Sequence, residues 1–154
     1  MKHKILISEK VAEETINMLE ENHMEIKYGG GISENDVIED IKDCDAVMVR
    51  VLPITKKVLD NAPNLKIIAK HGVGCDSIDI EEAHRRGIPV VYAPGSNSQS
   101  VAEHTMALIL ACARHLIETN LGYAKGDYQI KNRISFSEIS GKTLSIIGFG
   151  NIAK

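Results

Sequence analysis

Two short glycine-containing segments carry the residue types best suited to holding negatively charged groups. The segment 71–74 (HGVG) follows an apolar run, and its glycines leave main-chain N–H groups uncovered, as a bound carboxylate or phosphate requires. The segment 148–153 (GFGNIA) follows the apolar run 144–147, in the order by which a dinucleotide-binding fold passes from a strand into a helix. Both segments predict chemistry that depends on anion binding.

Short apolar runs alternate with helical patterns before these residues and around them. Helices are predicted at 11–22, from Ser33 to about residue 41, and at 79–86, where Asp79 can cap the start and Gly87 suits the end. Because a helix separates successive strands, the sequence predicts a doubly wound parallel sheet of the flavodoxin-like kind. Strands are predicted at 4–7, 24–28, 45–49, 65–69 and 88–92.

The second part of the chain has a different organisation. A helix is predicted at 98–117, started by a capping box of Ser100 and Glu103, and its apolar second half predicts burial between domains or subunits. A polar stretch then leads to a strand at 144–147 and the glycine turn. We place a domain boundary near Asn97. The α/β fold class is then a flavodoxin-like unit, 1–97, followed by the start of a Rossmann unit, 98–154.

Composition excludes several function classes. The 154 residues have a net charge of -3 with acids and bases interspersed, so no basic face predicts nucleic-acid binding. No apolar stretch approaches the ~20 residues of a membrane span, and no signal peptide is evident, so we expect a cytoplasmic protein. The three cysteines lack metal-ligand spacing and are expected to be buried thiols, with no disulfide and no metal.

Three segments in register carry a resemblance to a known family. They are 49–55 (VRVLPIT), 62–114 (APNLKIIAKHGVGC to ALILACAR) and 141–153 (GKTLSIIGFGNIA). Together they are similar to the D-isomer-specific 2-hydroxyacid dehydrogenases and, within them, to the D-3-phosphoglycerate dehydrogenases. The resemblance implies NAD-dependent hydride transfer, with oxidation of 3-phosphoglycerate in serine biosynthesis as the expected reaction. It also implies a substrate lobe, a nucleotide lobe, and a chain about half the length of a usual member.

The resemblance assigns residues to the substrate, a small 2-hydroxy or 2-keto acid. It implies that the amides of Val73 and Gly74 bind the carboxylate, that Arg50 reaches the phosphate, and that Asn97 lines the site. Each residue has a plainer interpretation as well. A tight turn explains the glycines, a surface ion pair would explain Arg50, and an Asx turn would explain Asn97.

The resemblance also assigns residues to NAD. Thr105 would pack against the nicotinamide, although helix packing explains it equally well. Gly148 and Gly150 would allow the turn, and the amides of Asn151 and Ile152 would face the pyrophosphate. We expect this chain alone to bind NAD poorly or not at all, because the helix and the acidic residue for the ribose would follow the turn.

No residue is assigned a catalytic role. In the family a histidine paired with a glutamate is the base and an arginine polarises the carbonyl, and all three follow the strands of the nucleotide lobe. The histidines present show no paired acid at a convincing spacing, and His71 is expected to be structural. The fragment is therefore predicted to be inactive by itself.

Several alternatives stay open. Glyoxylate, hydroxypyruvate and other 2-keto acid reductases belong to the same family and share its catalytic set. A different class is a stand-alone small-molecule-binding or dimerisation module, in which the helix region 98–117 would form a homodimer. A flavin or phospho-acceptor domain has the right layout, but its strand ends lack an acidic cluster and aromatic residues make up only 4% of the chain.

Overall fold

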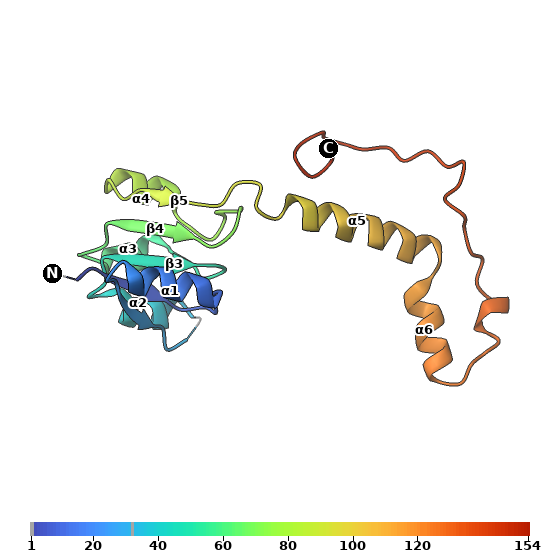
Figure 1. Ribbon diagram of the computed structural model, residues 1–154, viewed down its shortest axis with the longest axis horizontal. Coiled ribbons are helices and arrows are strands. Elements are labelled where there is room, and N and C mark those ends of the chain that lie inside the picture. The colour runs from blue at the N-terminus through green and yellow to red at the C-terminus, as the bar shows by residue number, and fades with distance from the viewer. Residues whose placement is uncertain (1, 32) are drawn as a thin grey trace. The chain divides into compact units, whose positions relative to one another are not determined.

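The computed structural model describes residues 2–31 and 33–154, which divide into two compact units between Ser96 and Asn97. The first unit contains a five-stranded sheet in the order β2-β1-β3-β4-β5, and every neighbouring pair is parallel (Figure 1). This order is the flavodoxin-like one, so the predicted α/β fold of the first unit is confirmed. The strands are β1 (Lys4–Ile7), β2 (Glu25–Tyr28), β3 (Ala46–Val49), β4 (Ile67–Lys70) and β5 (Val90–Val91).

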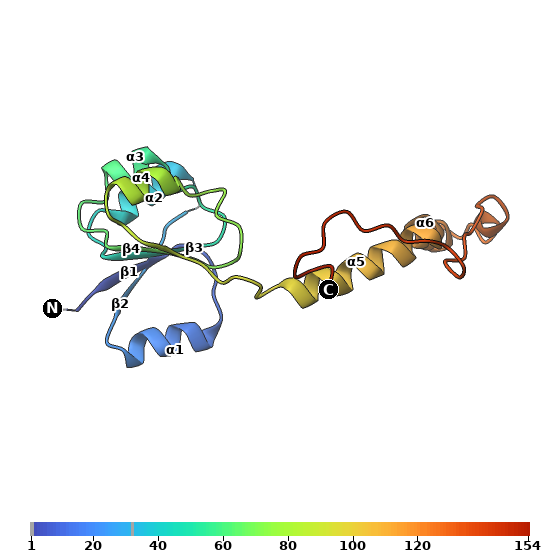
Figure 2. The same ribbon diagram turned by 90° about the horizontal axis from the view of Figure 1, so that it is seen from above.

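Helices cover both faces of this sheet. Figure 2 shows α1 (Glu13–Glu21) on one face and the other three helices of the unit on the opposite face. A strand's side chains alternate between the two faces, so a central strand such as β1 contributes to a separate core on each face. Ile5 and Ile7 pack on the α1 side, whereas Leu6 packs on the other side. The remaining helices are α2 (Glu34–Ile41), α3 (Lys56–Asp60) and α4 (Ile80–Arg85).

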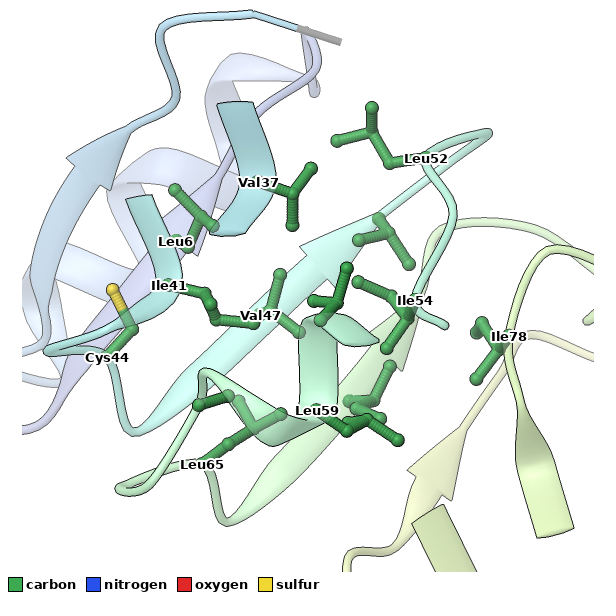
Figure 3. Close-up of a cluster of buried hydrophobic side chains, with 14 of the residues drawn as sticks. Leu6, Val37, Ile41, Cys44, Val47, Leu52, Ile54, Leu59, Leu65 and Ile78 are labelled. Carbon is green, nitrogen blue, oxygen red and sulfur yellow. The ribbon is translucent and has the colours of Figure 1, made fainter. Parts of the chain in front are cut away.

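The larger core lies between the sheet and α2, α3 and α4. Figure 3 shows Leu6 and Val47 from the strands meeting Ile41 and Leu59 from the helices. All four side chains are at most 2% exposed. Burial of such side chains contributes about 1.5–3 kcal/mol each. This core therefore holds β1, β3 and β4 in fixed register.

Side chains next to the helices determine where three of them begin. Ser33 forms a capping box with Asp36 at the start of α2, and Asp79 accepts the N–H of Glu82 at the start of α4, as predicted. The sequence prediction missed α3, which has only five residues. Its start is capped by the hydroxyl of Thr55, which accepts the N–H of Val58 at 3.3 Å.

The second unit consists of helices and extended chain. The single helix predicted at 98–117 is wrong: α5 (Ser98–Ala113) and α6 (Leu116–Ala124) are separate, because His115 adopts a left-handed conformation with φ 47°. The chain changes direction there (Figure 1). A 3₁₀ turn, Ile130–Asn132, follows. The predicted capping box is also wrong, since α5 begins at Ser98 and no side chain caps it.

The strand predicted at 144–147 is not formed. Ile147 is fully exposed, at 102%. A strand needs a neighbour to satisfy its N–H and C=O groups, and the described residues from Asn97 onward include no strand. The apolar half of α5 is exposed in the described chain. Its predicted burial between domains or subunits stays a prediction. Neither α5 nor any other described helix has the length and apolarity to cross a membrane.

The cysteines differ in exposure. Cys44 is buried in the larger core, Cys75 is half-buried, and Cys112 on α5 is exposed. All three are free thiols. The prediction of three buried thiols is therefore wrong for Cys112, which lies on the exposed apolar half of α5.

Candidate functional site: the carboxyl edge of the sheet

The loops that follow the five strands all emerge at one edge of the sheet, because every strand runs in the same direction. Ligands of doubly wound sheets bind beyond this carboxyl edge, where neighbouring connections leave to opposite faces. Here β1 and β3 are neighbours, and the helices that follow them, α1 and α3, lie on opposite faces. The crevice is therefore expected beside the loops after β1, β3 and β4.

The loop after β4 presents free main-chain donors. Gly72 has φ +147°, a conformation that side chains disfavour, and its C=O accepts the N–H of Ala93 at 3.0 Å. The N–H groups of Val73 and Gly74 donate to no described residue, and both residues are exposed. Consecutive free N–H groups of this kind can bind an anion.

Arg50, directly after β3, has a free guanidinium. Every other arginine in the described chain makes an ion pair or, for Arg114, lies over the ring of Phe136. The guanidinium of Arg50 makes no hydrogen bond or ion pair with a described residue. The surface ion pair that the sequence left open is thus not formed, and the forked donors of Arg50 remain available to an anion.

The main chain of Arg50, in contrast, is held by two side chains that sequence reasoning missed. The carboxylate of Glu9, in the loop after β1, accepts the N–H groups of Arg50 at 2.5 Å and of Val51 at 2.9 Å. The ammonium of Lys70, at the end of β4, donates to the C=O of Arg50 and to the hydroxyl of Ser77. Glu9 lies 41 residues from Arg50, and no local sequence pattern connects them.

A pocket of about 220 Å³ lies beside Glu9, at the ends of β1 and β2. The hydroxyl of Ser8 is buried there without a hydrogen-bond partner among the described residues. Gly29 is required nearby, because a Cβ at this position would come within 2.6 Å of the Ser8 Cβ. The pocket is lined by Ile7, Ser8, Glu9, Lys10, Val11, Ile16, Tyr28 and Gly29.

The described histidines show no catalytic arrangement at this edge. His71 is exposed, and its main-chain N–H donates to the C=O of Val49 at 2.8 Å. Its side chain contacts no described acid. The prediction that no histidine has a paired acid is wrong for His3, which lies 3.5 Å from Asp45, and for His115. Asp45 precedes β3, at the opposite edge of the sheet.

The nucleotide-binding residues predicted from the sequence all lie in the second unit, as does Asn97. Asn97 precedes α5 and its side chain caps nothing, so an Asx turn is not formed. Thr105 is exposed and its hydroxyl donates to the C=O of Val101 at 2.7 Å.

The glycine turn has a conformation suited to phosphate. Gly148 has φ +88°, and no atom lies within 4 Å of a Cβ placed on Gly148 or Gly150. The N–H groups of Asn151 and Ile152 donate to no described residue. The N–H of Ala153 donates to the C=O of Gly150 at 3.2 Å. Residues 151–153 therefore form a turn at the position where a dinucleotide-binding fold begins its helix.

The fold defines an α/β protein with a doubly wound parallel sheet, and free main-chain and guanidinium donors lie at the carboxyl edge of that sheet. The model of the family "D-isomer specific 2-hydroxyacid dehydrogenase, catalytic domain" matches residues 5–151, and the chain belongs to this family. Among the residues that the structure describes, no group of three His, Cys, Asp or Glu side chains could hold a metal ion.

Known relatives support the family assignment. The chain is 40% identical to D-3-phosphoglycerate dehydrogenase of Methanocaldococcus jannaschii, with 98% of this chain and 29% of the relative covered. It is 37% identical to glyoxylate reductase of Pyrococcus furiosus, with 100% of this chain and 48% of the relative covered. The crystal structure of NAD⁺-bound 3-phosphoglycerate dehydrogenase of Entamoeba histolytica has a TM-score of 0.77 at 29% identity, with 99% and 48% covered.

The chain thus spans between about a third and a half of the length of these relatives. The family consists of oxidoreductases that act on 2-hydroxy acids, and NAD is bound in solved members of the fold. The particular substrate differs between relatives of similar identity.

Proposed function

We propose that this chain supplies the substrate-binding lobe, and the beginning of the nucleotide lobe, of an NAD-dependent dehydrogenase that oxidises 3-phosphoglycerate. The observation that carries the proposal is the pair of free donor groups at one edge of the sheet, the amides of Val73 and Gly74 and the guanidinium of Arg50. A molecule with a carboxylate at one end and a phosphate at the other suits such a pair.

Each group has a separate task in this proposal. The amides of Val73 and Gly74 hold the carboxylate by charge-assisted hydrogen bonds, which are about twice as strong as neutral ones. Arg50 binds the phosphate through two parallel N–H donors. Binding at both ends fixes the carbon that bears the hydroxyl, and such orientation contributes several kcal/mol to catalysis, on the order of 7–11 at best.

The free main-chain N–H groups of the glycine turn are suited to the phosphates of NAD. Gly148 and Gly150 leave space for a pyrophosphate, and the amides of Asn151 and Ile152 are free to bind it, while Thr105 would lie against the nicotinamide. NAD, when bound, supplies the acceptor of the hydride. Residues 151–153 form a turn and not the first turn of a helix. Such a turn has no helix dipole to strengthen phosphate binding, and we expect weak binding of NAD to this chain.

A reductase acting on glyoxylate or hydroxypyruvate is the second candidate within the family, favoured by the similarity to the Pyrococcus furiosus relative. Glyoxylate has a carboxylate but no distal phosphate. It would occupy the amides of Val73 and Gly74 and leave Arg50 without a partner. The behaviour of Arg50 variants therefore distinguishes the two candidates.

Dimerisation through the region 98–117 is part of the proposal. The apolar side chains of α5 and α6 are about half exposed, and association of two copies would remove them from water. We expect a homodimer in the cytoplasm, with no nucleic-acid or membrane partner. A stand-alone binding or dimerisation module would show the same surface. The exposed set includes Met106, Leu108, Leu110, Leu116, Ile117 and Leu121.

The test uses the protein made from its own gene. Its intact mass is compared with the 16.9 kDa of this chain, and formation of NADH is followed with 3-phosphoglycerate, and loss of NADH with glyoxylate. We expect oxidation of 3-phosphoglycerate, and in Arg50→Met a KM for this substrate raised about 100-fold, with Lys125→Met unchanged.

Two results would contradict the proposal. Turnover of glyoxylate alone, with no effect of Arg50→Met, would favour the reductase. A mass of 16.9 kDa with tight binding of 3-phosphoglycerate and no turnover would favour the binding module.

A further inference from the structure

The main chain of Arg50 is fixed from both sides by charged side chains. Its N–H donates to Glu9, and its C=O accepts from Lys70. These side chains come from the loop after β1 and the end of β4, the two strands that flank β3 in the sheet. The backbone at Arg50 is therefore tied to both neighbours, although the residue itself is exposed and lies outside the strand.

Glu9 uses both carboxylate oxygens for this contact. Oε2 accepts the N–H groups of Arg50 at 2.5 Å and Val51 at 2.9 Å, and Oε1 lies 3.1 Å from the N–H of Val51. A carboxylate accepts such bonds more strongly than a neutral amide, and two adjacent N–H groups fix the direction of the peptide as well as its position. The Cα–Cβ bond of Arg50 departs from this peptide, so the point from which the guanidinium extends is fixed too.

The sign of the charge on Glu9 argues against a role as a ligand for anions. A carboxylate beside an anion-binding edge repels a phosphate, so by charge alone its removal would strengthen binding. The contact of Glu9 with the main chain predicts instead that its removal would weaken binding of the anion. Loss of the contact would free the peptide of Arg50, and its guanidinium would then occupy many positions. Binding of the anion would have to order the guanidinium, and the lost conformational entropy would weaken binding. The two effects differ in sign and can be separated.

We propose that Glu9 and Lys70 are positioning residues that fix the main chain at Arg50 so that its guanidinium meets the distal anionic group of the ligand. The proposal rests on the proposed function for the identity of that ligand. It does not require catalysis, because it concerns where the guanidinium lies.

The experiment titrates the ¹⁵N-labelled chain with inorganic phosphate and follows the Arg50 side-chain N–H resonance. In Glu9→Gln, which loses the charge and the two-oxygen contact, we expect the Kd for phosphate to rise about tenfold, equivalent to ~1.4 kcal/mol. In the Arg50→Met background, where the Gly74 amide is followed instead, we expect Glu9→Gln to change the Kd no further, because the two residues act as one unit.

The control is Glu14→Gln, which removes the same charge from an exposed residue on α1 that makes no hydrogen bond or ion pair with a described residue. We expect its Kd to equal that of the parent chain. Unchanged amide resonances in β2 verify that each variant is folded. Glu9→Asp, which keeps the charge on a shorter side chain, is expected to weaken binding as well.

Three outcomes would overturn the inference: a Kd that falls or stays constant in Glu9→Gln, additive effects of the Glu9 and Arg50 variants, or no binding of phosphate to the parent chain. Failure of the proposed function is separate. It would appear as absent turnover of 3-phosphoglycerate by the protein made from its own gene, with the effect of Glu9→Gln on phosphate binding retained.

Discussion

The carboxylate of Asp45 accepts the main-chain N–H of Lys4 at 2.9 Å, and so joins the start of β1 to the residue that precedes β3. The ammonium of Lys66 lies 2.7 Å from the other oxygen of Asp45. This contact lies at the amino edge of the sheet, opposite the candidate site. The two edges are therefore held by the same type of bond, between a carboxylate of one strand's loop and the main chain of its neighbour.

The contacts of Asp45 predict a loss of stability in acid. The hydrogen bond from Lys66, and then that from the N–H of Lys4, lower the pKa of Asp45 to about 2. Because the folded pKa lies below the unfolded value of about 3.9, this stabilisation is present above about pH 4 and is lost as the pH falls toward 2. Urea titrations should show a smaller loss of unfolding free energy between about pH 5 and about pH 2 in Asp45→Asn than in the parent. Glu14→Gln should lose as much unfolding free energy over this pH range as the parent does. An equal loss in all three chains would contradict this role of Asp45.

Leu6 tests the larger core. Its side chain is fully buried between β1 and the helices of one face, so Leu6→Ala should lower the free energy of unfolding by about 2–5 kcal/mol. Met18→Ala removes a side chain that is 59% exposed and should change it by no more than ~0.5 kcal/mol. Chemical denaturation measures both, and a similar value for the two would contradict the burial described here.

Gly72 tests the shape of the loop that we propose binds the carboxylate. Its φ of +147° is one that alanine avoids, so Gly72→Ala should cost about 1–3 kcal/mol or move the loop. The matched variant is Gly30→Ala, whose new Cβ would meet its nearest atom at an ordinary 3.9 Å. We expect Gly72→Ala to weaken binding of 3-phosphoglycerate in calorimetry and Gly30→Ala to leave it unchanged. Full binding by Gly72→Ala would show that the loop's geometry is not needed.

The cysteines should react in a fixed order. Cys112 is exposed, whereas burial raises the pKa of the Cys44 thiol to about 11, and the thiolate is the reactive form. At about pH 8, iodoacetamide should therefore modify Cys112 first and Cys44 only after denaturant is added. Peptide mass spectrometry locates the label. Early labelling of Cys44 would mean that the core around it opens in the native state.

The first unit could be predicted from the sequence because its information is local. Apolar runs of four or five residues separated by capped helices define the parallel sheet, and Ser33 and Asp79 mark helix starts that the structure confirms. The helix α3 was missed because its five residues hold too little periodicity, and only Thr55 marks it.

The failures share a different cause, which is dependence on distant partners. Residues 144–147 have the composition of a strand, but a strand exists only beside another. Nothing in the apolar sequence around His115 predicts that it takes a left-handed conformation and ends α5. At the candidate site, the sequence placed Val73 and Gly74 on a loop after a strand, whereas the contact of Glu9 with Arg50 depends on how two loops meet. The roles of these residues toward ligands stay predictions.

The chain divides into two units between Ser96 and Asn97, and the two units should differ in their resistance to proteases. Proteases cut where the main chain can leave its hydrogen bonds and enter their active site, and the extended residues around Ile147 offer such a segment. The strands of the first unit are protected by their ladders and core. Brief digestion with a broad-specificity protease should therefore trim the chain from its carboxyl end and leave a resistant piece that contains the five-stranded sheet. Such a piece is the natural starting material for crystals of the candidate site.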